Sequence, residues 1–204
     1  MARPRAVDYD DKRKAILSAA AHAFAETGFD GASMSQIALA CGVSKALLYH
    51  YYTNKEQLLF DVIEAHLEDL VAAVEAVPAD LGPTERLVLL CTAILEAYRD
   101  ADAEHKVQIN NLSRLPADKQ DRLKEMERRL VDVFAEAIAH ANPDLRRDPR
   151  LLKPVTMSLF GMLNWHYLWF RPGGPISRQD YAALVARMIV TGTNSLDEVL
   201  SERG

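Results

Sequence analysis

The side chains best suited to chemistry near the start of the chain are lysine and aromatic residues that follow Gly42. A short helix is expected after this glycine, with Leu48 as its inward-facing residue. Lys45, Tyr49 and His50 then lie on the other faces of that helix. Lysine binds phosphate or guanine and the tyrosine hydroxyl reaches phosphate oxygens, so the pattern fits contact with the DNA major groove. A helical hairpin with surface aromatic residues fits the same pattern equally well.

The segment that must position these side chains reads as two short helices around a turn. Ser33 and Gln36 stand at the spacing of a capping box, which predicts that a helix begins there. Gly42 supplies the positive φ at which this helix ends, and Ser44 is able to cap the second helix. The sequence therefore predicts a helix-turn-helix from Ser33 to Tyr52.

A third helix is predicted directly after the helix-turn-helix. Thr53 and Glu56 form another capping box, with Lys55 in the first turn. The apolar spacing continues as far as the stop at Pro78, so this helix is expected over residues 54–77. A helix N-terminus aimed at DNA would add backbone amides and a lysine to the phosphate contacts.

The order of residues from Gly42 to Leu58 resembles a known family. The motif Gly-Val-Ser-Lys-x-x-Leu-Tyr-x-Tyr-Tyr-x-Asn-Lys-Glu-x-Leu is similar to the DNA-binding domain of the tetracycline-repressor-like (TetR) family, and the resemblance extends from about Lys12 to Leu59. It implies a homodimeric transcriptional repressor, not an enzyme, that binds double-stranded operator DNA and a small-molecule effector. The residues from which we expect DNA contacts are Ser33, Ser35, Ser44, Lys45, Leu47, Tyr49, His50, Tyr51 and Lys55.

Composition indicates a globular chain with a substantial core. With 204 residues, of which 49% are hydrophobic, it is able to form one large domain or two small ones. No apolar run is long enough to span a membrane and no signal-peptide pattern opens the chain, so a cytoplasmic protein without a membrane partner is expected. Cys41 and Cys91 lack metal-ligand spacing, and we expect reduced core cysteines, no metal site and no resident cofactor.

The net charge of −5 argues at first against a nucleic-acid partner, because phosphate neutralisation needs cations. The distribution of charge weakens this objection. Through Lys55 the chain has seven lysine and arginine residues against five acidic residues, so the excess of negative charge lies in the remainder. The asymmetry is modest and carries little weight alone.

The helical patterns predict an all-α fold of about nine helices in two domains, residues 1–53 and 54–204. The first helix is expected to begin at Asp10 or Asp11 and to run to Thr27. The further elements expected after the helix at 54–77 are helices over residues 84–98, 104–115, 117–141, 154–170 and 181–200, and a loop bracketed by the prolines at 143 and 149.

The most unusual segment is the helix predicted over residues 154–170, which is apolar nearly all round. Such a helix needs burial on more than one side, and with the next helix it is expected to form a four-helix interface with a second copy of the chain. Polar groups among its aromatic rings fit a ligand pocket, although ordinary packing explains any single one of them better. The family resemblance implies an effector pocket here, and the residues expected to line it are Tyr98, Asn110, Asn164, Trp165, Tyr167, Trp169 and Arg171.

A second resemblance narrows the effector class. The motif Met-Leu-Asn-Trp-x-Tyr-x-Trp-Phe-Arg-Pro-Gly-Gly-x-Ile-Ser, from Met162 to Ser177, is similar to a segment of TetR-type regulators of fatty-acid, phenylacetate and steroid breakdown. Several of those regulators sense acyl-coenzyme A thioesters. A ligand of this class needs cations for its phosphates, and Arg171, Arg99 and Arg114 are available.

Two alternatives stay open at this point. A regulator of efflux would use the same pocket for a planar or hydrophobic drug. A small helical enzyme or scaffold without DNA binding would be a different class of protein, but the chain has none of the common catalytic motifs.

In the favoured hypothesis, a repressor, the effector tilts the helix that starts at Asn54 and changes the separation of two DNA-binding heads. The affinities for effector and for DNA are then coupled reciprocally.

Overall fold

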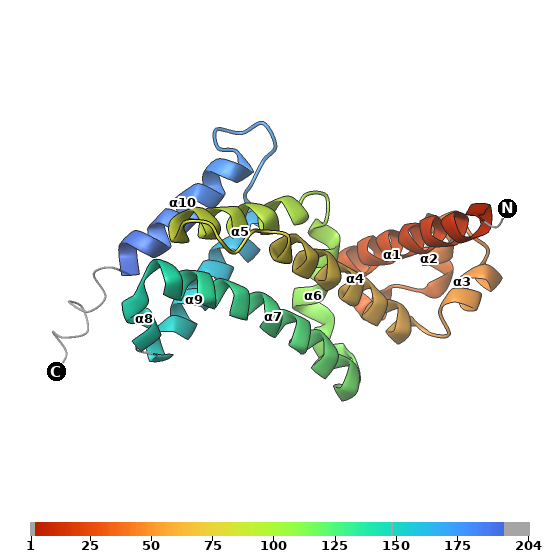
Figure 1. The fold of residues 1–204 in the computed structure, drawn as a ribbon. Coiled ribbons are helices and arrows are strands. Elements are labelled where there is room, and N and C mark those ends of the chain that lie inside the picture. Colours follow the sequence, from red (N-terminus) through yellow and green to blue (C-terminus); the bar gives the residue numbers. More distant parts are fainter. Residues whose placement is uncertain (1–2, 148, 194–204) are drawn as a thin grey trace. The chain divides into compact units, whose positions relative to one another are not determined.

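The computed structural model describes residues 3–147 and 149–193, with side chains described for residues 9–146 and 150–193. Over these residues the backbone forms α-helices and two short 3₁₀ helices, with no strand, which confirms the predicted all-α fold (Figure 1). The chain divides into two compact units. The first contains Met1–Glu68 and Ala101–Glu125, and the second contains Asp69–Asp100 and Met126–Gly204.

The first unit contains the predicted helix-turn-helix. Its elements are α1 (Arg3–Gly31), α2 (Met34–Ala40), α3 (Lys45–Tyr51), most of α4 (Lys55–Glu75), α6 (Asp102–Asn111), the 3₁₀ helix η1 (Leu112–Arg114) and the start of α7 (Ala117–Ala141). The prediction that α1 begins at Asp10 or Asp11 was wrong, because the helix already starts at Arg3. Its predicted end is marked by a kink at Gly28, where φ is 74°, before the helix resumes for one short turn.

The core of the first unit lies beneath the helix-turn-helix. Ile16, Ala20 and Phe24 form a buried stripe on α1, and the Phe24 ring packs against Phe29 with their centroids 5.6 Å apart. Helix α6 packs on α1. Because the kink frees carbonyl groups of α1, Lys106 of α6 is able to donate from its ammonium group to the Ala25 carbonyl at 2.7 Å.

The start of α4 differs from the predicted capping box at Thr53 and Glu56. The side-chain oxygen of Asn54 accepts the amide of Gln57 at 2.8 Å, so the cap is one residue later than expected and α4 begins at Lys55. The helix ends at Glu75, close to the predicted end. An asparagine before Lys55 is an equally good cap by chemistry, and the spacing rule alone did not separate the two positions.

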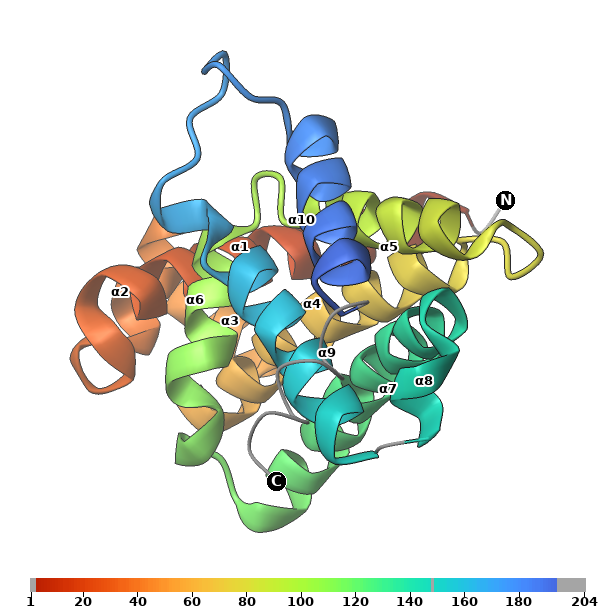
Figure 2. The ribbon, with the colours of Figure 1, turned by 90° about the vertical axis from the view of Figure 1, so that its left-hand side faces the viewer.

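The second unit is built from the remaining helices. They are α5 (Pro83–Ala97), α8 (Pro143–Arg147), α9 (Pro149–Asn164), the 3₁₀ helix η2 (His166–Leu168) and α10 (Arg178–Thr193), with the ends of α4 and α7. Helices α5 and α10 lie side by side (Figures 1 and 2). Ala182 and Ala186 of α10 are fully buried, as are Leu90 and Ile94 of α5, and small side chains such as alanine allow two helices to approach closely.

Two predictions for the second unit were wrong. Residues 143–147 form α8 instead of a loop, because proline is tolerated in the first turn of a helix and therefore opens one here. Helix α9 ends at Asn164 and does not continue to Phe170, since the chain tightens into η2, where the carbonyl of His166 accepts the amides of Trp169 and Phe170. Residues 194–200 of the predicted last helix lie outside the described residues.

The predicted domain boundary at residue 53 stays a prediction. By contacts, residues 101–125 group with the helix-turn-helix, and α4 and α7 each contribute to both units. In the described part of the chain no helix is both long and apolar enough to cross a membrane.

Candidate functional site

The exposed face of α3 carries the side chains that the sequence marks for DNA contact. Lys45, Tyr49 and His50 are exposed, with the Tyr49 side chain 45% accessible, and the Lys45 ammonium lies 5.9 Å from the centre of the Tyr49 ring. Leu48 is fully buried and fixes the rotation of the helix about its axis, as the sequence predicts. Leu47 is half-buried beside it. The helix therefore presents a cationic and aromatic face to solvent.

Caps fix where α2 and α3 begin. The Ser33 hydroxyl accepts the Gln36 amide at 3.2 Å and the Gln36 side chain accepts the Ser33 amide at 3.0 Å, which confirms the predicted capping box. Gly42 adopts a φ of 68°, also as predicted. The Ser44 hydroxyl accepts the Leu47 amide at 3.1 Å and so holds the first turn of α3. Ser35 is exposed on α2.

An ion pair between α1 and α4 lies near Tyr52, the residue that follows α3. Arg13 of α1 donates to the Asp61 carboxylate of α4 at 2.9 Å. Tyr52 follows α3 directly and is 3% exposed, and burial, with the nearby Asp61 charge, raises the pKa of its hydroxyl to about 12. This hydroxyl stays protonated at neutral pH and belongs to the framework of α3.

Tyr51 is half-buried among other aromatic rings. Its ring stacks on Tyr9 of α1 with centroids 4.8 Å apart and an angle of 22° between the planes. Tyr9 was not among the predicted site residues, because the first helix was expected to begin after it. It lies two helical turns before Ile16, so extending the apolar stripe backward would have found it.

Lys55 has a structural role that sequence reasoning missed. Its ammonium group donates to the carbonyl of Ala32 at 2.9 Å and lies 4.5 Å from the centre of the Phe29 ring. The second carbonyl in reach is that of Asp30, at 3.4 Å. These contacts connect the start of α4 to the segment between α1 and α2. Contact between Lys55 and phosphate stays a prediction, as does DNA contact by the other predicted residues.

In the second unit, two of the predicted effector residues meet. The Tyr98 hydroxyl donates to the side-chain oxygen of Asn164 at 2.8 Å, which joins the end of α5 to the end of α9. Tyr98 is 5% exposed, and burial raises the pKa of its hydroxyl, with a smaller contribution from the charge of Glu127. The pair places two polar groups among apolar helices. A few polar groups in a largely apolar surrounding are a common feature of ligand sites.

The other predicted effector residues of this unit lie closer to the surface. Trp165 and Trp169 are about half exposed, Tyr167 is half-buried and Arg171 is exposed. The buried residue of the segment is instead His166, whose ring stacks on Phe170 with centroids 4.3 Å apart. Burial, and then the charge of Arg178, lower the pKa of His166 to about 4.

Asn110 belongs to the first unit, where its side-chain amide donates to the Lys106 carbonyl at 2.8 Å. Of the arginines considered for phosphate binding, Arg99 and Arg171 lie in the second unit, and Arg99 forms an ion pair with Glu96. Arg114 lies in the first unit and forms an ion pair with Asp30 at 3.2 Å.

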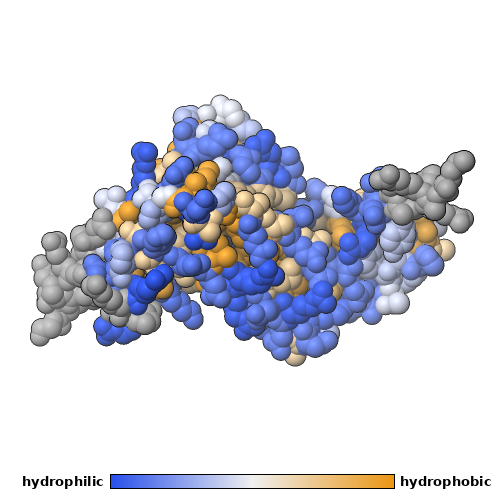
Figure 3. Space-filling model, in the orientation of Figure 1, coloured by the Kyte–Doolittle hydropathy of each residue, from blue (hydrophilic) through white to orange (hydrophobic). Residues whose placement is uncertain are grey.

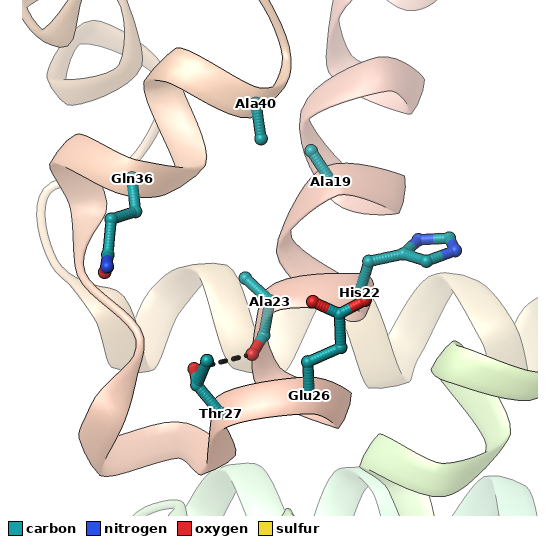
Figure 4. Close-up of a pocket in the computed structure, with 7 residues that line it drawn as sticks. All are labelled: Ala19, His22, Ala23, Glu26, Thr27, Gln36 and Ala40. Carbon is teal, nitrogen blue, oxygen red and sulfur yellow. Dashed lines mark hydrogen bonds between the residues drawn. The ribbon is translucent and has the colours of Figure 1, made fainter.

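An open surface hollow of about 420 Å³ lies between α1 and α2 of the first unit (Figure 4). The residues that line it are Ala19, His22, Ala23, Glu26, Thr27, Gln36 and Ala40. The Thr27 hydroxyl donates to the carbonyl of Ala23 at 2.9 Å and is therefore used within α1. None of the residues predicted to contact an effector lines this hollow.

Comparison with known proteins identifies the family. Residues 16–62 match the model described as bacterial regulatory proteins of the tetR family, and residues 80–193 match the tetracyclin repressor-like C-terminal domain. The chain belongs to the TetR family. As a TetR-family protein it is a DNA-binding transcriptional regulator, which confirms the predicted family and the prediction that the chain is not an enzyme.

Relatives within the TetR family cover nearly the whole chain. The transcriptional repressor KstR2 of Mycobacterium tuberculosis is 27% identical over 194 residues, which cover 90% of this chain and 93% of KstR2. A TetR-family regulator from Bordetella parapertussis is 31% identical, with a TM-score of 0.81 over 87% of this chain and 93% of that one. AibR in complex with isovaleryl coenzyme A and operator DNA is 28% identical, with a TM-score of 0.71 over 87% and 97% of the two chains.

Proposed function

We propose that this TetR-family regulator is a homodimeric repressor that is released from its operator by an acyl-coenzyme A thioester or a related apolar molecule. The proposal has three parts, which are the operator contact of α3, the dimer and the effector. The observation that carries it is the exposed row of Lys45, Tyr49 and His50 on a helix fixed by buried Leu48.

Support for the operator contact comes from the chemistry of the α3 face. Half or more of protein–DNA hydrogen bonds go to phosphates and sugars, and lysine and tyrosine are typical donors. An imidazole such as that of His50 is also able to contact a base edge in the major groove. TetR-family proteins regulate transcription in bacteria, so we propose that this protein acts in the cytoplasm.

Support for the dimer comes from apolar side chains that the chain leaves exposed on its second unit. On α9 and α10, Met157, Leu184 and Met188 are each about half exposed. Figure 3 shows hydrophobic side chains gathered over α5 and α10 on the face that it draws. Large exposed apolar patches mark interfaces, and a twofold pairing of two such helices buries them against each other. Two operator half-sites then require two heads.

Support for the effector class comes from AibR and from the second unit. AibR, similar over most of its length, binds isovaleryl coenzyme A. In this chain the Tyr98–Asn164 pair offers a buried hydroxyl and a half-buried amide among apolar helices. Such a pair suits the thioester carbonyl or another single polar group on an otherwise apolar ligand.

Native mass spectrometry of the protein purified from its own host tests the effector class. The expected result is a mass added to the dimer that releases a coenzyme A thioester on denaturation. A drug-like mass without coenzyme A would favour a regulator of efflux. In an electrophoretic mobility shift with DNA from directly upstream of the gene, isovaleryl coenzyme A at increasing concentration is expected to release the protein, whereas free coenzyme A is not.

A further inference from the structure

We propose that Tyr9 is a positioning residue for operator binding, because it holds the Tyr51 ring in the orientation in which the Tyr51 hydroxyl reaches DNA phosphate. The inference rests on the proposed operator contact of α3. Nothing in the sequence motif assigns a role to Tyr9, which lies outside the helix-turn-helix.

The geometry brings together two helices at the end of the α3 face. Tyr51 is the last residue of α3. Tyr9 lies in the N-terminal part of α1, where its ring contacts the Tyr51 ring. Their centroids are 4.8 Å apart and their planes differ by 22°, which is an ordinary stacked arrangement. The Tyr9 side chain is 50% exposed, so its outer surface is open to solvent while its inner surface contacts Tyr51.

Among the described residues, Tyr9 is the ring that contacts Tyr51 from a different helix. The other described rings near Tyr51 are its chain neighbours, His50 at 6.1 Å with an edge-on contact and Tyr52 at 6.5 Å with planes 26° apart. These neighbours move with α3, whereas Tyr9 is fixed by α1. The Tyr51 ring therefore has one face supported by an element that does not depend on its own helix.

Because the Tyr51 ring already stacks on Tyr9, less conformational entropy is lost when DNA binding immobilises it. A side chain that is ordered only in the complex loses rotamer freedom at that step, and the loss subtracts from affinity. The stack with Tyr9 orders the Tyr51 ring before DNA arrives. This role depends on the ring of Tyr9 and not on its hydroxyl, which makes phenylalanine a sufficient replacement.

A double-mutant cycle on operator affinity tests the role. The probe is a fluorescent duplex of the DNA directly upstream of the gene, and affinity is measured by anisotropy. We expect Tyr9→Ala to weaken binding about three- to tenfold, and both Tyr9→Phe and the exposed neutral control Ser18→Ala to bind within about twofold of the unmodified protein. In a Tyr51→Ala background, Tyr9→Ala is expected to have no further effect.

Each result of this cycle decides between the alternatives. The inference is overturned if Tyr9→Ala lowers operator affinity by the same factor in the unmodified protein and in the Tyr51→Ala background. It is also overturned if Tyr9→Phe binds the operator as weakly as Tyr9→Ala. Lys45→Ala is measured in parallel: if it binds like the unmodified protein, the operator contact of α3 fails and the role of Tyr9 fails with it. If Lys45→Ala is weak and Tyr9→Ala is unchanged, the inference about Tyr9 fails alone. Thermal melting of each variant verifies that the fold is retained.

Discussion

At the scale of single residues, Lys55 combines a predicted DNA contact with an observed structural one. Its ammonium group already bonds the Ala32 carbonyl, and the same group is the predicted phosphate contact. A substitution of Lys55 changes a different measurable quantity for each of the two roles. Loss of a phosphate contact changes how binding depends on salt, whereas loss of a structural contact changes thermal stability.

Lys55→Ala is expected to lower operator affinity and to reduce the slope of log affinity against log salt by about 1, because one counterion fewer is released. A lower melting temperature is expected as well, since the carbonyl groups of Ala32 and Asp30 lose their donor. An anisotropy titration at several salt concentrations measures the slope. A slope equal to that of the unmodified protein would argue against the phosphate contact. Lys55 would then have only the structural role.

The buried histidines give the stability of the fold a pH dependence. His66 is 4% exposed, and burial, with the nearby ring of His105, lowers its pKa from 6.5 to about 3. Between these values the unfolded chain binds a proton on His66 and the folded chain does not. The free energy of unfolding therefore falls as the pH is lowered from 6.5 toward 3.

For His66 this loss is expected to reach about 2 kcal/mol at pH 5 relative to neutral pH. Urea unfolding at pH 7 and pH 5 measures it, and His66→Gln should reduce the difference between the two pH values by about that amount. The exposed and non-titratable Ser18→Ala is the control and is expected to leave the difference unchanged. A pH dependence that is the same in His66→Gln and in the unmodified protein would contradict the account.

At the scale of elements, the caps decide where the DNA-binding helices begin. Ser44 accepts the Leu47 amide and so holds the first turn of α3. Ser44→Ala is expected to destabilise the protein by about 1 kcal/mol, which for a chain of this size lowers the melting temperature by about 2–4 °C. Calorimetry measures the shift. Ser35→Ala, within α2 and exposed, should melt like the unmodified protein, and an equal loss in both variants would show that the cap is not the cause.

Sequence reasoning predicted the elements whose signals are local. The capping box at Ser33, the positive φ of Gly42 and the inward position of Leu48 depend on a few neighbouring residues, and all three were confirmed. The family and the all-helical fold were confirmed as well, since the motif after Gly42 is specific.

What could not be predicted depends on contacts between distant residues. The stack of Tyr9 on Tyr51 and the bonds of Lys55 to the carbonyls of Asp30 and Ala32 join residues that are more than 20 positions apart. Beyond the early end of α9, the His166 ring stacks on Phe170 and Tyr181, and no periodicity in the segment shows these contacts. The lining of an effector pocket stays a prediction for the same reason.

At the scale of the whole molecule, the proposed dimer depends on the exposed apolar residues of α9 and α10. Met188→Glu places a charge on the proposed interface and is expected to shift the protein toward a single subunit in analytical ultracentrifugation. Because two linked heads bind two half-sites, operator affinity should fall at least tenfold. Ile109→Glu, an exposed apolar residue of the first unit, is the matched control. A dimer that survives Met188→Glu while Ile109→Glu dissociates it would place the interface elsewhere.

The central claim is that the exposed face of α3 binds the operator. The most direct test is a comparison of the unmodified protein and Lys45→Ala on duplex DNA from upstream of the gene, by anisotropy over a range of salt concentrations. We expect the unmodified protein to bind with an affinity that falls steeply with salt, and Lys45→Ala to bind at least tenfold more weakly with a salt slope smaller by about 1. Equal affinity and equal slope for the two proteins would contradict the account.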